Sequence, residues 1–534
     1  MKIFLNFQNW LATLSLVWSP NKILLVLLNV CIGSILILRA FMGGSTIDLV
    51  DFLFFSFVGL LVTLYRPGWV FLILIGMLPY ENITIAPESF GFFLRPYQWL
   101  LVLLFLALAI RLLFRRFPFA SLVLTRWDTL LIVLGVSAFF SALFSTHPAV
   151  ALKQSVILST FIILFFICRL FIRSIDDVRM VFPFLFSSFL VIACYAIAQN
   201  ILFLSGQESL EVMIGRPNAT FTEADWLGGY LAVIIVTLSA LIVSPSLVVR
   251  YVTLHKARIF FSILLFFGFV ALIITVSRSA WLATLAGSIL ALGMFAWQKD
   301  MFTVFNVWNI RTLKKASVVT LFIAIPLLMS LLLIYSTGLT PFDLLDRGKS
   351  LTSGEQKITV ACQQESNVPD RIQDVTDLAE YGCEHITLEE RVQKQKDGAY
   401  ITEIPRVDPN INIRQNIYYK TLALLKEQWF FGVGFGVIAT FLGTDGRGAG
   451  LNASNIFLEI WLGAGIIGLL AFIILWFGLG WQWFFRGITE RSSLALILSA
   501  VWLCVTVFNL FNSGLLLGWF FLFLACLIID DQKT

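Results

Sequence analysis

Long apolar runs separated by short polar loops dominate this sequence. A helix needs about 20 mostly apolar residues to cross the hydrocarbon core of a bilayer, and the runs that approach this length are residues 23–42, 47–65, 67–80, 97–114, 128–146, 153–173, 180–204, 227–247, 259–276, 280–297, 316–336, 457–479, 493–511 and 514–529. The third run is short, and only Asn512, Ser513 and Gly514 separate the last two. The pattern predicts an all-α fold, a polytopic transmembrane helical bundle of about 14 spans (about 12 to 14).

Composition supports a chain whose solvent is mostly lipid. The 534 residues are 59% hydrophobic and 13% charged, and their mean hydropathy is +0.90. A soluble protein carries roughly 25% charged residues, so this chain has too little charge to cover a globular surface. The 52 Phe and 16 Trp residues suit lipid-facing helices and aromatic interface belts.

Charge is sorted by side along the chain. If the amino end is cytoplasmic, the basic clusters fall in cytoplasmic loops, as in Arg66; Arg115, Arg116, Arg126; Arg173, Arg179; Arg250, Lys256, Arg258; Lys299, Arg311, Lys314, Lys315; and Arg486, Arg491. Acidic residues such as Glu81, Glu88, Glu208 and Glu211 then fall outside. This sorting predicts cytoplasmic amino and carboxy termini in a bacterial cytoplasmic (inner) membrane. The first long apolar run follows Lys22 and is expected to remain as an anchor.

One long polar segment interrupts the apolar runs and is expected to be extracytoplasmic. The predicted division is eleven transmembrane helices in residues 1–336, a large outer loop at 337–456, and three transmembrane helices in 457–534. Within the loop, 414–428 has the spacing of an amphipathic helix at the outer interface. Cys362 and Cys383 either form a disulfide on the oxidising side or remain free thiols. The segment shows no sign of a soluble domain.

Several kinds of catalytic site are missing from the sequence. It has no Walker-type phosphate loop, no nucleophile elbow and no Cys/His cluster with metal spacing. The three histidines, His147, His255 and His385, fit surface positions better than catalytic ones. We therefore expect no cofactor and no metal, and the net charge of +5 does not indicate nucleic acid as a partner.

Three arginines stand where the predicted outer surface meets the spans. Arg216 precedes one span, Arg278 lies between two spans with almost no loop, and Arg414 opens the amphipathic stretch. An arginine close to hydrocarbon is costly unless it is paired, and its guanidinium fork matches phosphate oxygens. Together the three favour binding of a lipid-linked diphosphate. The alternative is that each extends to lipid headgroups.

Carboxylates and glycines near the carboxy-terminal spans add candidate chemistry. Glu459 lies inside a span four residues after Asn455, and we expect an arginine partner for it. Glu459, Asp445, Glu223 and Asp225 are each placed to act as a general base. The glycines of 432–450, including Gly434 and Gly436, resemble a tight re-entrant turn. Those at 463, 465 and 468 favour close helix packing.

These segments occur in an order that resembles the O-antigen ligase and polymerase superfamily of bacterial envelope glycan enzymes. The resemblance runs from about Arg216 to Gly468. It rests on Arg-Pro-Asn-Ala-Thr-Phe at 216–221, Thr-Val-Ser-Arg-Ser at 275–279, the long outer loop, Arg414, the Trp-Phe-Phe-Gly-Val-Gly-Phe-Gly run at 429–436, Asn-Ile-Phe-Leu-Glu at 455–459, and Gly-Ile-Ile-Gly at 465–468.

The resemblance implies an inverting glycosyltransferase without metal or nucleotide. It would transfer or polymerise a polyprenyl-diphosphate-linked saccharide onto a glycan, lipid or protein acceptor outside the cytoplasmic membrane, in lipopolysaccharide or other cell-surface polysaccharide biosynthesis. Arg216, Arg278 and Arg414 would hold the donor diphosphate, supported by Asn455, Gly434 and Gly436.

One position departs from the family pattern. Family ligases carry a His-Asn pair nine residues before Gly-x-x-Gly, whereas this chain has Ser454-Asn455. Serine cannot replace an imidazole as proton acceptor near neutral pH. The candidate catalytic residues are therefore Glu459, Asp445 and Ser454 itself. A multi-span transporter and a non-catalytic envelope-assembly scaffold remain the alternative functions.

Overall fold

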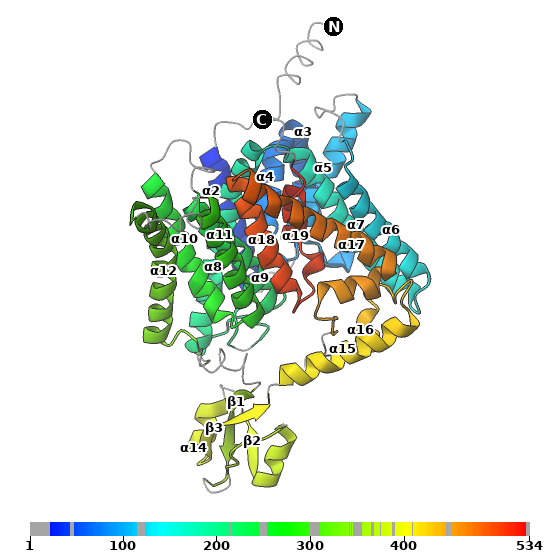
Figure 1. The fold of residues 1–534 in the computed structure, drawn as a ribbon. Coiled ribbons are helices and arrows are strands. Elements are labelled where there is room, and N and C mark those ends of the chain that lie inside the picture. The colour runs from blue at the N-terminus through cyan, green and yellow to red at the C-terminus, as the bar shows by residue number, and fades with distance from the viewer. Residues whose placement is uncertain are drawn as a thin grey trace, which may run out of the picture.

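The fold is a bundle of apolar helices with a small β-containing unit beneath it in the view of Figure 1. The computed structural model describes residues 22–42, 47–114, 123–213, 215–244, 254–298, 310–340, 342, 344, 355–364, 368–373, 375–386, 390–407, 409–444, 448 and 450–529. The bundle helices are α2 (Lys22–Phe41), α3 (Leu49–Tyr65), α4 (Pro67–Met77), α5 (Pro96–Leu113), α6 (Arg126–Leu143), α7 (Pro148–Phe171), α8 (Ile175–Leu204), α9 (Ala224–Val243), α10 (Leu254–Ile274), α11 (Arg278–Gln298), α12 (Ile310–Thr337), α17 (Ile456–Thr489), α18 (Ser493–Asn509) and α19 (Gly518–Cys526).

Each apolar run of the sequence coincides with one of these helices. Among the described residues, ten helices have the length and composition to cross a membrane: α2, α5 to α12 and α17. The helices α3, α4 and α18 are apolar but shorter, and α19 has 9 residues. The helical membrane-protein class is thus confirmed, whereas the number of crossings stays a prediction.

The outside of the bundle is apolar, as expected of a surface that faces lipid. Ile23 is 78% exposed, Leu113 81% and Leu332 61%, although all three are large aliphatic side chains. Water would make such a surface unfavourable by about 25 cal/mol for each Å² of apolar area. Lipid tails carry no such cost, so the outward apolar face is stable only in a bilayer.

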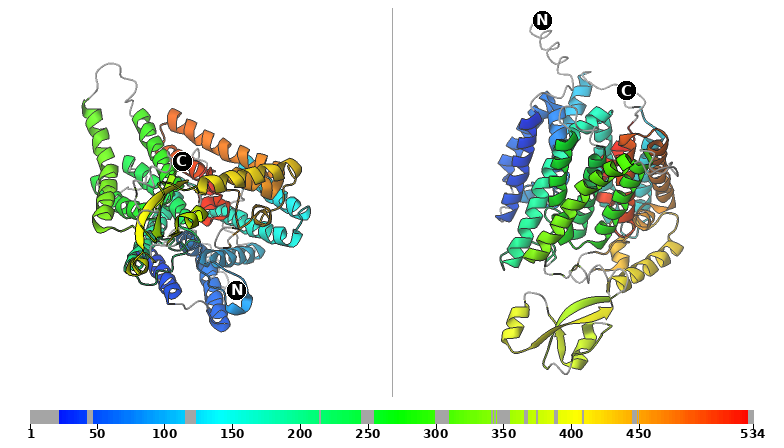
Figure 2. Two further views of the ribbon diagram at one scale, coloured as in Figure 1. Left: turned by 90° about the horizontal axis from the view of Figure 1, so that it is seen from below. Right: turned by 60° about the vertical axis from the view of Figure 1, so that its left-hand side comes forward.

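Helix α9 lies at the centre of the bundle. It packs against α10, α11 and α18, and 89% of the residues in its most apolar stretch are buried by protein. Its sequence is apolar on every side, which is the pattern of a helix surrounded by other helices. Figure 2 shows the same compact bundle from below and from the side. Because α9 begins just after Arg216, the centre of the bundle is tied to the candidate site.

Charges buried in the bundle are paired. Asp128 on α6 and Arg169 on α7 form an ion pair of 3.2 Å. At the other end of the bundle, Arg95 lies 2.8 Å from Glu81, whose second carboxylate oxygen accepts the N–H of Gly518 at the start of α19 at 3.0 Å. Since an unpaired buried charge costs several kcal/mol, these pairs fix how neighbouring helices meet.

The polar segment after α12 contains a folded β unit. Strands β1 (Glu355–Cys362), β2 (Cys383–His385) and β3 (Tyr400–Val407) form an antiparallel sheet in the order β2-β1-β3. Ile358, Val360 and Ile404 are buried in a core separate from that of the bundle. The sequence interpretation did not expect this folded unit, whose core forms because apolar residues of β1 and β3, such as Ile358 and Ile404, are paired in the sheet. We call residues 355–407 the β subdomain.

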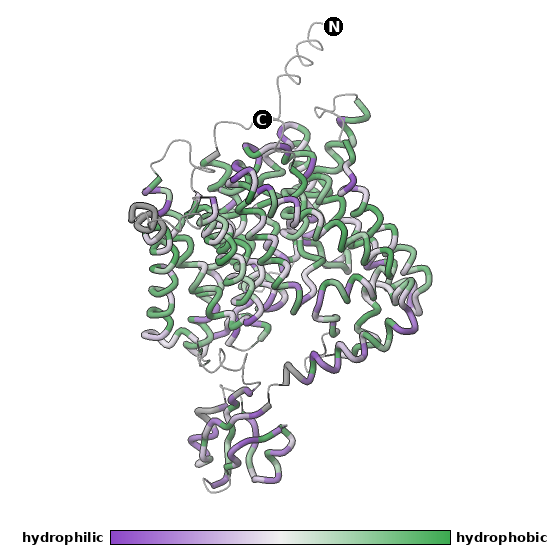
Figure 3. Tube along the Cα trace, viewed as in Figure 1, coloured by the Kyte–Doolittle hydropathy of each residue, from purple (hydrophilic) through white to green (hydrophobic). Residues whose placement is uncertain are grey.

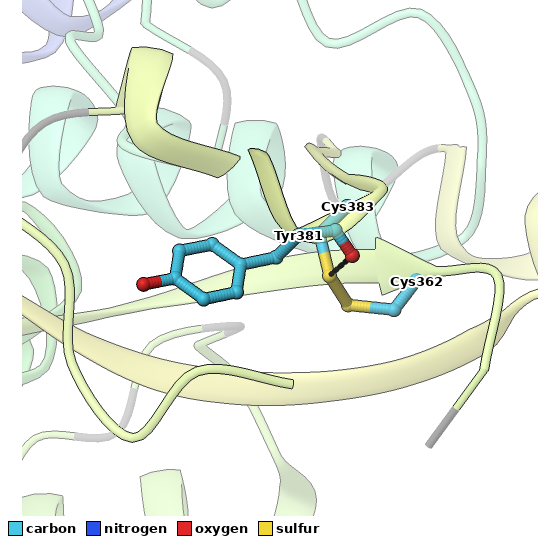
Figure 4. The surroundings of a disulfide bond; sticks show 3 residues. All are labelled: Cys362, Tyr381 and Cys383. Carbon is cyan, nitrogen blue, oxygen red and sulfur yellow. Dashed lines mark hydrogen bonds between the residues drawn. A yellow bond between two sulfur atoms is a disulfide. The ribbon is translucent and has the colours of Figure 1, made fainter. Parts of the chain in front are cut away.

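A disulfide joins two strands of the β subdomain. Cys362 ends β1 and Cys383 begins β2, and the two are paired in the sheet register. Figure 4 shows this disulfide, with the Cys383 sulfur 3.6 Å from the carbonyl oxygen of Tyr381. The sequence left open whether these thiols pair, and the structure pairs them. The short helix α14 (Glu390–Lys396) completes the subdomain.

Helix α15 (Pro409–Glu427) links the β subdomain to the bundle, where α16 (Ile438–Leu442) follows. Helix α15 covers nearly all of the stretch 414–428 that was expected to be an amphipathic helix, and it begins five residues earlier. Figure 3 shows the purple, hydrophilic colouring concentrated in α15 and the β subdomain, against the mostly green bundle. Ile417 and Leu425 are buried, whereas Tyr419 is 76% exposed. The helix therefore has one face against the protein and one face outside.

Candidate functional site

The loop that carries Arg216 is closed by its own side chains. The amide of Asn218 donates to the carbonyl of Phe221 at 2.6 Å, and its oxygen accepts the N–H of Val212 at 3.1 Å. Thr220 donates to the carbonyl of Pro79 at 2.7 Å, which ties the loop to the segment after α4. The Asn-Ala-Thr residues of this motif thus have a structural role: they set the direction in which Arg216 leaves the backbone.

Arg216 has two oxygen partners, and its Nη1 also lies 3.6 Å from the sulfur of Met213. Its Nη2 lies 3.0 Å from Oδ1 of Asp225, in the first turn of α9, and its Nε donates to the carbonyl of Thr275 at 2.9 Å. The side chain of Arg216 is 16% exposed. A guanidinium has five N–H donors in a fixed fork, so these contacts orient the group and leave further donors for a ligand.

The turn between α10 and α11 brings Arg278 to the same place. Thr275, whose carbonyl binds Arg216, stands three residues before Arg278, the first residue of α11. Val276 in this turn has a positive φ of 53°, a conformation that costs a β-branched residue energy and persists where neighbours enforce it. The hydroxyl of Ser277 donates to Asp225. Asp225 therefore joins the Arg216 loop to the Arg278 turn.

Arg414 approaches this group from α15. Its Nη2 donates to the carbonyl of Phe511 at 3.4 Å, and its guanidinium lies 5.6 Å from the centre of the Phe511 ring. Its positive charge also acts on Asp225. Arg216 and Arg414, from two separate elements, thus both act on the carboxylate of Asp225, and Arg278 follows Ser277 in the turn beside it. We call Arg216, Arg278, Arg414 and Asp225 the arginine cluster.

The segment 510–514, between α18 and α19, connects the arginine cluster to the Ser454 motif. The amide of Asn455 donates to the carbonyl of Leu510 at 3.2 Å, next to the Phe511 carbonyl that binds Arg414. The amide of Asn512 donates to the hydroxyl of Ser279, the neighbour of Arg278, at 2.9 Å. The sequence interpretation treated this segment only as a break between spans. The run of polar residues 512–513 between two apolar stretches was the available signal.

Residues 452–459 form a capped helix start. The side chain of Asn455 accepts the N–H groups of Phe457 and Leu458 at 2.9 and 3.3 Å, as an N-cap residue does. One oxygen of Glu459 accepts the N–H of Ala453 at 2.7 Å. The arginine partner expected for Glu459 is absent among the described residues, because its carboxylate turns back to the chain that precedes the helix.

Ser454 occupies the strained position of this turn. It has a positive φ of 50°, and its carbonyl accepts the hydroxyl of Tyr418 on α15 at 3.4 Å. Non-glycine residues in the left-handed region occur at functional sites, where the surroundings hold them there. The structure places Ser454 on a turn fastened to both α15 and α17. Asp445, the third catalytic candidate of the sequence, lies outside the described residues.

The glycine-rich turn at 432–436 packs into a break in α17. Gly465 has φ 68° and ψ −174°, which interrupts the helix, and a side chain there would meet the carbonyl of Phe430. The N–H of Ile466 donates to that carbonyl at 3.1 Å, and the carbonyl of Leu462 accepts the N–H of Gly434 at 3.1 Å. The packing role expected for the second glycine group fits Gly463, whereas Gly465 breaks the helix.

Gly434 and Gly436, predicted to support the site, have φ values of 92° and 81° and form this turn. The hydroxyl of Ser145, after α6, donates to the carbonyl of Val433 at 2.6 Å. Broken helices at membrane depth are tolerated where the freed backbone groups find partners. Here the turn supplies those partners, and so positions the α17 start that carries Asn455 and Glu459.

Comparison with known proteins bears on this arrangement. Residues 263–473 match the protein family described as O-Antigen ligase. Over these residues the chain is similar to the O-antigen ligase and polymerase superfamily. The matched segment contains Arg278, Arg414, Ser454 and Glu459 and ends before the 510–514 segment. No curated protein and no solved structure matches the chain.

The family match confirms the resemblance drawn from the sequence motifs. It agrees with the bundle of apolar helices and with a membrane protein that handles glycans. Arg216 lies outside the matched residues, and its place in the arginine cluster comes from its contacts with Asp225 and Thr275.

Proposed function

We propose that this chain is a membrane glycosyltransferase that transfers or polymerises a polyprenyl-diphosphate-linked saccharide on the extracytoplasmic face. The observation that carries the proposal is the arginine cluster, in which Arg216 and Arg414 act on the single carboxylate of Asp225 and Arg278 begins the helix after the Thr275 turn. Asp225 carries one negative charge against the two guanidinium charges of Arg216 and Arg414, so these two cations keep an excess of positive charge over Asp225. A diphosphate supplies the missing negative charge and the acceptor oxygens.

In the proposed reaction an acceptor hydroxyl oxygen attacks the anomeric carbon of the donor sugar. The new glycosidic C–O bond forms as the C–O bond to the diphosphate breaks, and the anomeric configuration inverts. The electron pair of the broken bond stays on the polyprenyl diphosphate, where Arg216, Arg278 and Arg414 stabilise the charge that develops. The acceptor proton passes to a carboxylate, for which Glu459 and Asp445 are the candidates.

Glu459 is the candidate that geometry favours among the described residues. It lies on the α17 start that Asn455 fastens to Leu510, beside the Phe511 carbonyl that binds Arg414. A base on the same framework as the diphosphate arginines keeps a constant distance from the donor. Ser454, on the adjacent turn, then supports this framework through its contact with Tyr418.

The proposal is tested with Arg278→Ala and Arg414→Ala in a strain that lacks the chromosomal copy. We expect each variant to insert normally and to lower glycan transfer by about 10²-fold, the usual effect of removing one charge-stabilising donor. Lys420→Ala is the matched control, since Lys420 lies on the same helix as Arg414 and binds the carbonyl of Leu442 instead. Surface glycan of normal amount and length in both arginine variants contradicts the proposal.

Assays with the purified protein distinguish a glycosyltransferase from a transporter. In nanodiscs with lipid-linked saccharide and acceptor, a glycosyltransferase releases polyprenyl diphosphate in step with product. Movement of free substrate into proteoliposomes without any lipid-linked donor supports a transporter instead and rejects the proposed reaction.

A further inference from the structure

The β subdomain has an open polar cavity of its own, away from the arginine cluster. The cavity measures about 490 Å³ and is lined by Ala361, Cys362, Gln363, Ala379, Gly382, Cys383, Glu384, Asp397, Gly398 and Ala399. Volumes of about 300 to 1,000 Å³ are typical of ligand sites. Four segments contribute to it: the end of β1, the 3-10 helix η4 (Val375–Tyr381), the start of β2, and the turn before β3. The disulfide holds the end of β1 and the start of β2 together.

Two of the three polar side chains at this cavity are carboxylates, which only accept hydrogen bonds when ionised. Gln363, Glu384 and Asp397 are the polar side chains of the lining, and all three are exposed. Lys394 forms an ion pair of 2.5 Å with Glu384, which restrains that carboxylate at the cavity. Carboxylates accept hydroxyl hydrogens in short, charge-assisted hydrogen bonds. A ligand rich in hydroxyl groups therefore fits this lining better than an apolar or anionic one.

Net charge narrows the ligand class further. Residues 355–407 contain eleven acidic and six basic side chains, a net charge of −5, whereas the whole chain carries +5. A polyanionic saccharide would be repelled by the β subdomain, and the repulsion would be strongest at low salt. Neutral saccharides do not meet this barrier.

The position of the cavity sets which part of a saccharide it can hold. In the register, Glu355 pairs with Val407 at the end of the sheet next to α15, and Cys362 pairs with Tyr400 at the opposite end, where the cavity lies. Eight residues of β-strand span about 25 Å. The cavity is thus remote from α15, which begins two residues after Val407 and carries Arg414. It is too far to hold the reacting sugar.

We propose that this cavity binds a distal portion of a neutral saccharide chain while the reacting end lies at the arginine cluster. The binding itself is independent of the proposed glycosyl transfer, whereas its effect on product length rests on that proposed function. The β subdomain then retains the glycan between reactions and contributes to the choice of acceptor or to the length of the product.

Binding is measured on the full chain in nanodiscs, with N-acetylated chito-oligosaccharides and laminari-oligosaccharides as neutral probes and oligogalacturonate as the acidic probe. We expect at least one neutral probe to bind and the acidic probe to fail. The double variant Glu384→Gln with Asp397→Asn should weaken neutral binding about tenfold, a loss of about 1.4 kcal/mol. Binding by none of the neutral probes, or preferential binding of oligogalacturonate, overturns the proposal.

Matched variants separate the cavity from the rest of the subdomain. Glu403→Gln removes an exposed acid of β3 that does not line the cavity, and Lys394→Gln breaks the ion pair but keeps the Glu384 carboxylate. Both should bind within about threefold of the unaltered chain, a small difference in free energy. Ala399→Trp places a large side chain in the lining and should abolish binding even if the double variant folds poorly. Unchanged binding in Ala399→Trp rejects the site.

The glycosyltransferase proposal and the cavity proposal can be rejected independently of each other. Arg278→Ala should keep neutral-saccharide binding and lose transfer. Ala399→Trp should lose binding and keep some transfer with an altered product-length distribution. Loss of transfer without loss of binding in Ala399→Trp would reject the cavity and leave the arginine cluster intact.

Discussion

Arg216 lies 3.0 Å from Asp225, and this ion pair joins the loop before α9 to the first turn of α9. The two side chains are 16% and 32% exposed, so water screens the pair only in part. Removing one partner of a shielded pair leaves the other charge unpaired, which costs more than the pair itself contributes. Asp225 therefore determines where the Arg216 fork points.

Exchanging the charges of Arg216 and Asp225 tests whether transfer requires only their ion pair or requires the guanidinium to start from position 216. The double variant Arg216→Asp with Asp225→Arg should insert and remain folded, because the ion pair can re-form. We expect its transfer activity to fall about 10²-fold, since the guanidinium now starts from α9 and points elsewhere. Thermal stability and glycan transfer are measured together. Activity close to that of the unaltered chain would mean that the direction of Arg216 is unimportant.

The variant Glu459→Gln tests whether the Glu459 carboxylate acts as the general base or only holds the turn at Ser454 in place. Glutamine still accepts the N–H of Ala453, which Glu459 binds at 2.7 Å, but it cannot take up a proton. If Glu459 is the base, Glu459→Gln retains stability and loses transfer about 10²- to 10⁴-fold. Glu459→Ala should lose both, because the turn at Ser454 loses its acceptor. Full activity of Glu459→Gln assigns Glu459 to the turn and leaves Asp445 as the candidate base.

Gly465→Ala should disrupt the break in α17. At φ 68° an L side chain is strained, and its Cβ would lie 2.1 Å from the carbonyl oxygen of Phe430. We expect a destabilisation of about 1 to 3 kcal/mol or more from the backbone strain alone, seen as a lower melting temperature in nanodiscs. Gly293→Ala is the control, because Gly293 lies in α11 with open space around it and should be neutral or stabilising. Equal melting temperatures for both variants would contradict the close packing at Gly465.

Removing the disulfide should loosen the β subdomain and spare the bundle. Cys362 and Cys383 are 21 residues apart, and closing a loop of that size stabilises by about 3 kcal/mol in the chain-entropy description. Cys362→Ser with Cys383→Ser should make residues 355–407 more sensitive to protease, while membrane insertion is unchanged. Cys31→Ser, at an exposed free thiol on α2, is the control. Unaltered proteolysis in the double variant would show that the apolar core around Ile358, Val360 and Ile404 is sufficient to hold the β subdomain together.

The loop that carries Arg216 should respond to pH through Glu211. Burial raises the pKa of the Glu211 carboxyl to about 7, and the N–H of Gly215 that it binds at 3.0 Å opposes the shift. Because the raised pKa disfavours the ionised form in the folded loop, this contribution to stability is present below the unfolded value of 4.5 and is lost as pH rises through about 7.

Amide hydrogen exchange of residues 205–221, corrected for intrinsic rates, should therefore show less protection at about pH 8 than at about pH 5. Glu211→Gln should remove that difference. Glu208→Gln, an exposed acid of the same loop, should preserve it. A pH response that persists in Glu211→Gln would assign the effect to another group.

The class of the protein and the main candidate residues followed from local pattern. Apolar runs long enough for a membrane helix required helices, because a bilayer offers backbone groups no other partner. Arg216, Arg278 and Arg414 were recognisable because each is a charge at the edge of an apolar run. The β subdomain was missed because its strands lie in a polar segment that contains Pro369 and Pro405, and because the three residues of β2 (Cys383–His385) are too few to show a period.

The sequence by itself determined the helical membrane fold, the arginines and the amphipathic helix, since each depends on the length, spacing or charge of one segment. Only the tertiary structure decided that Arg216 and Arg414 share Asp225, that the Phe511 carbonyl accepts from Arg414, and that Glu459 binds the N–H of Ala453 instead of an arginine. These interactions join residues that are from six positions apart (Ala453 and Glu459) to 189 positions apart (Asp225 and Arg414). Their formation depends on how α9, α15, α17 and the 510–514 segment pack, and a linear pattern of polar and apolar residues does not encode that packing.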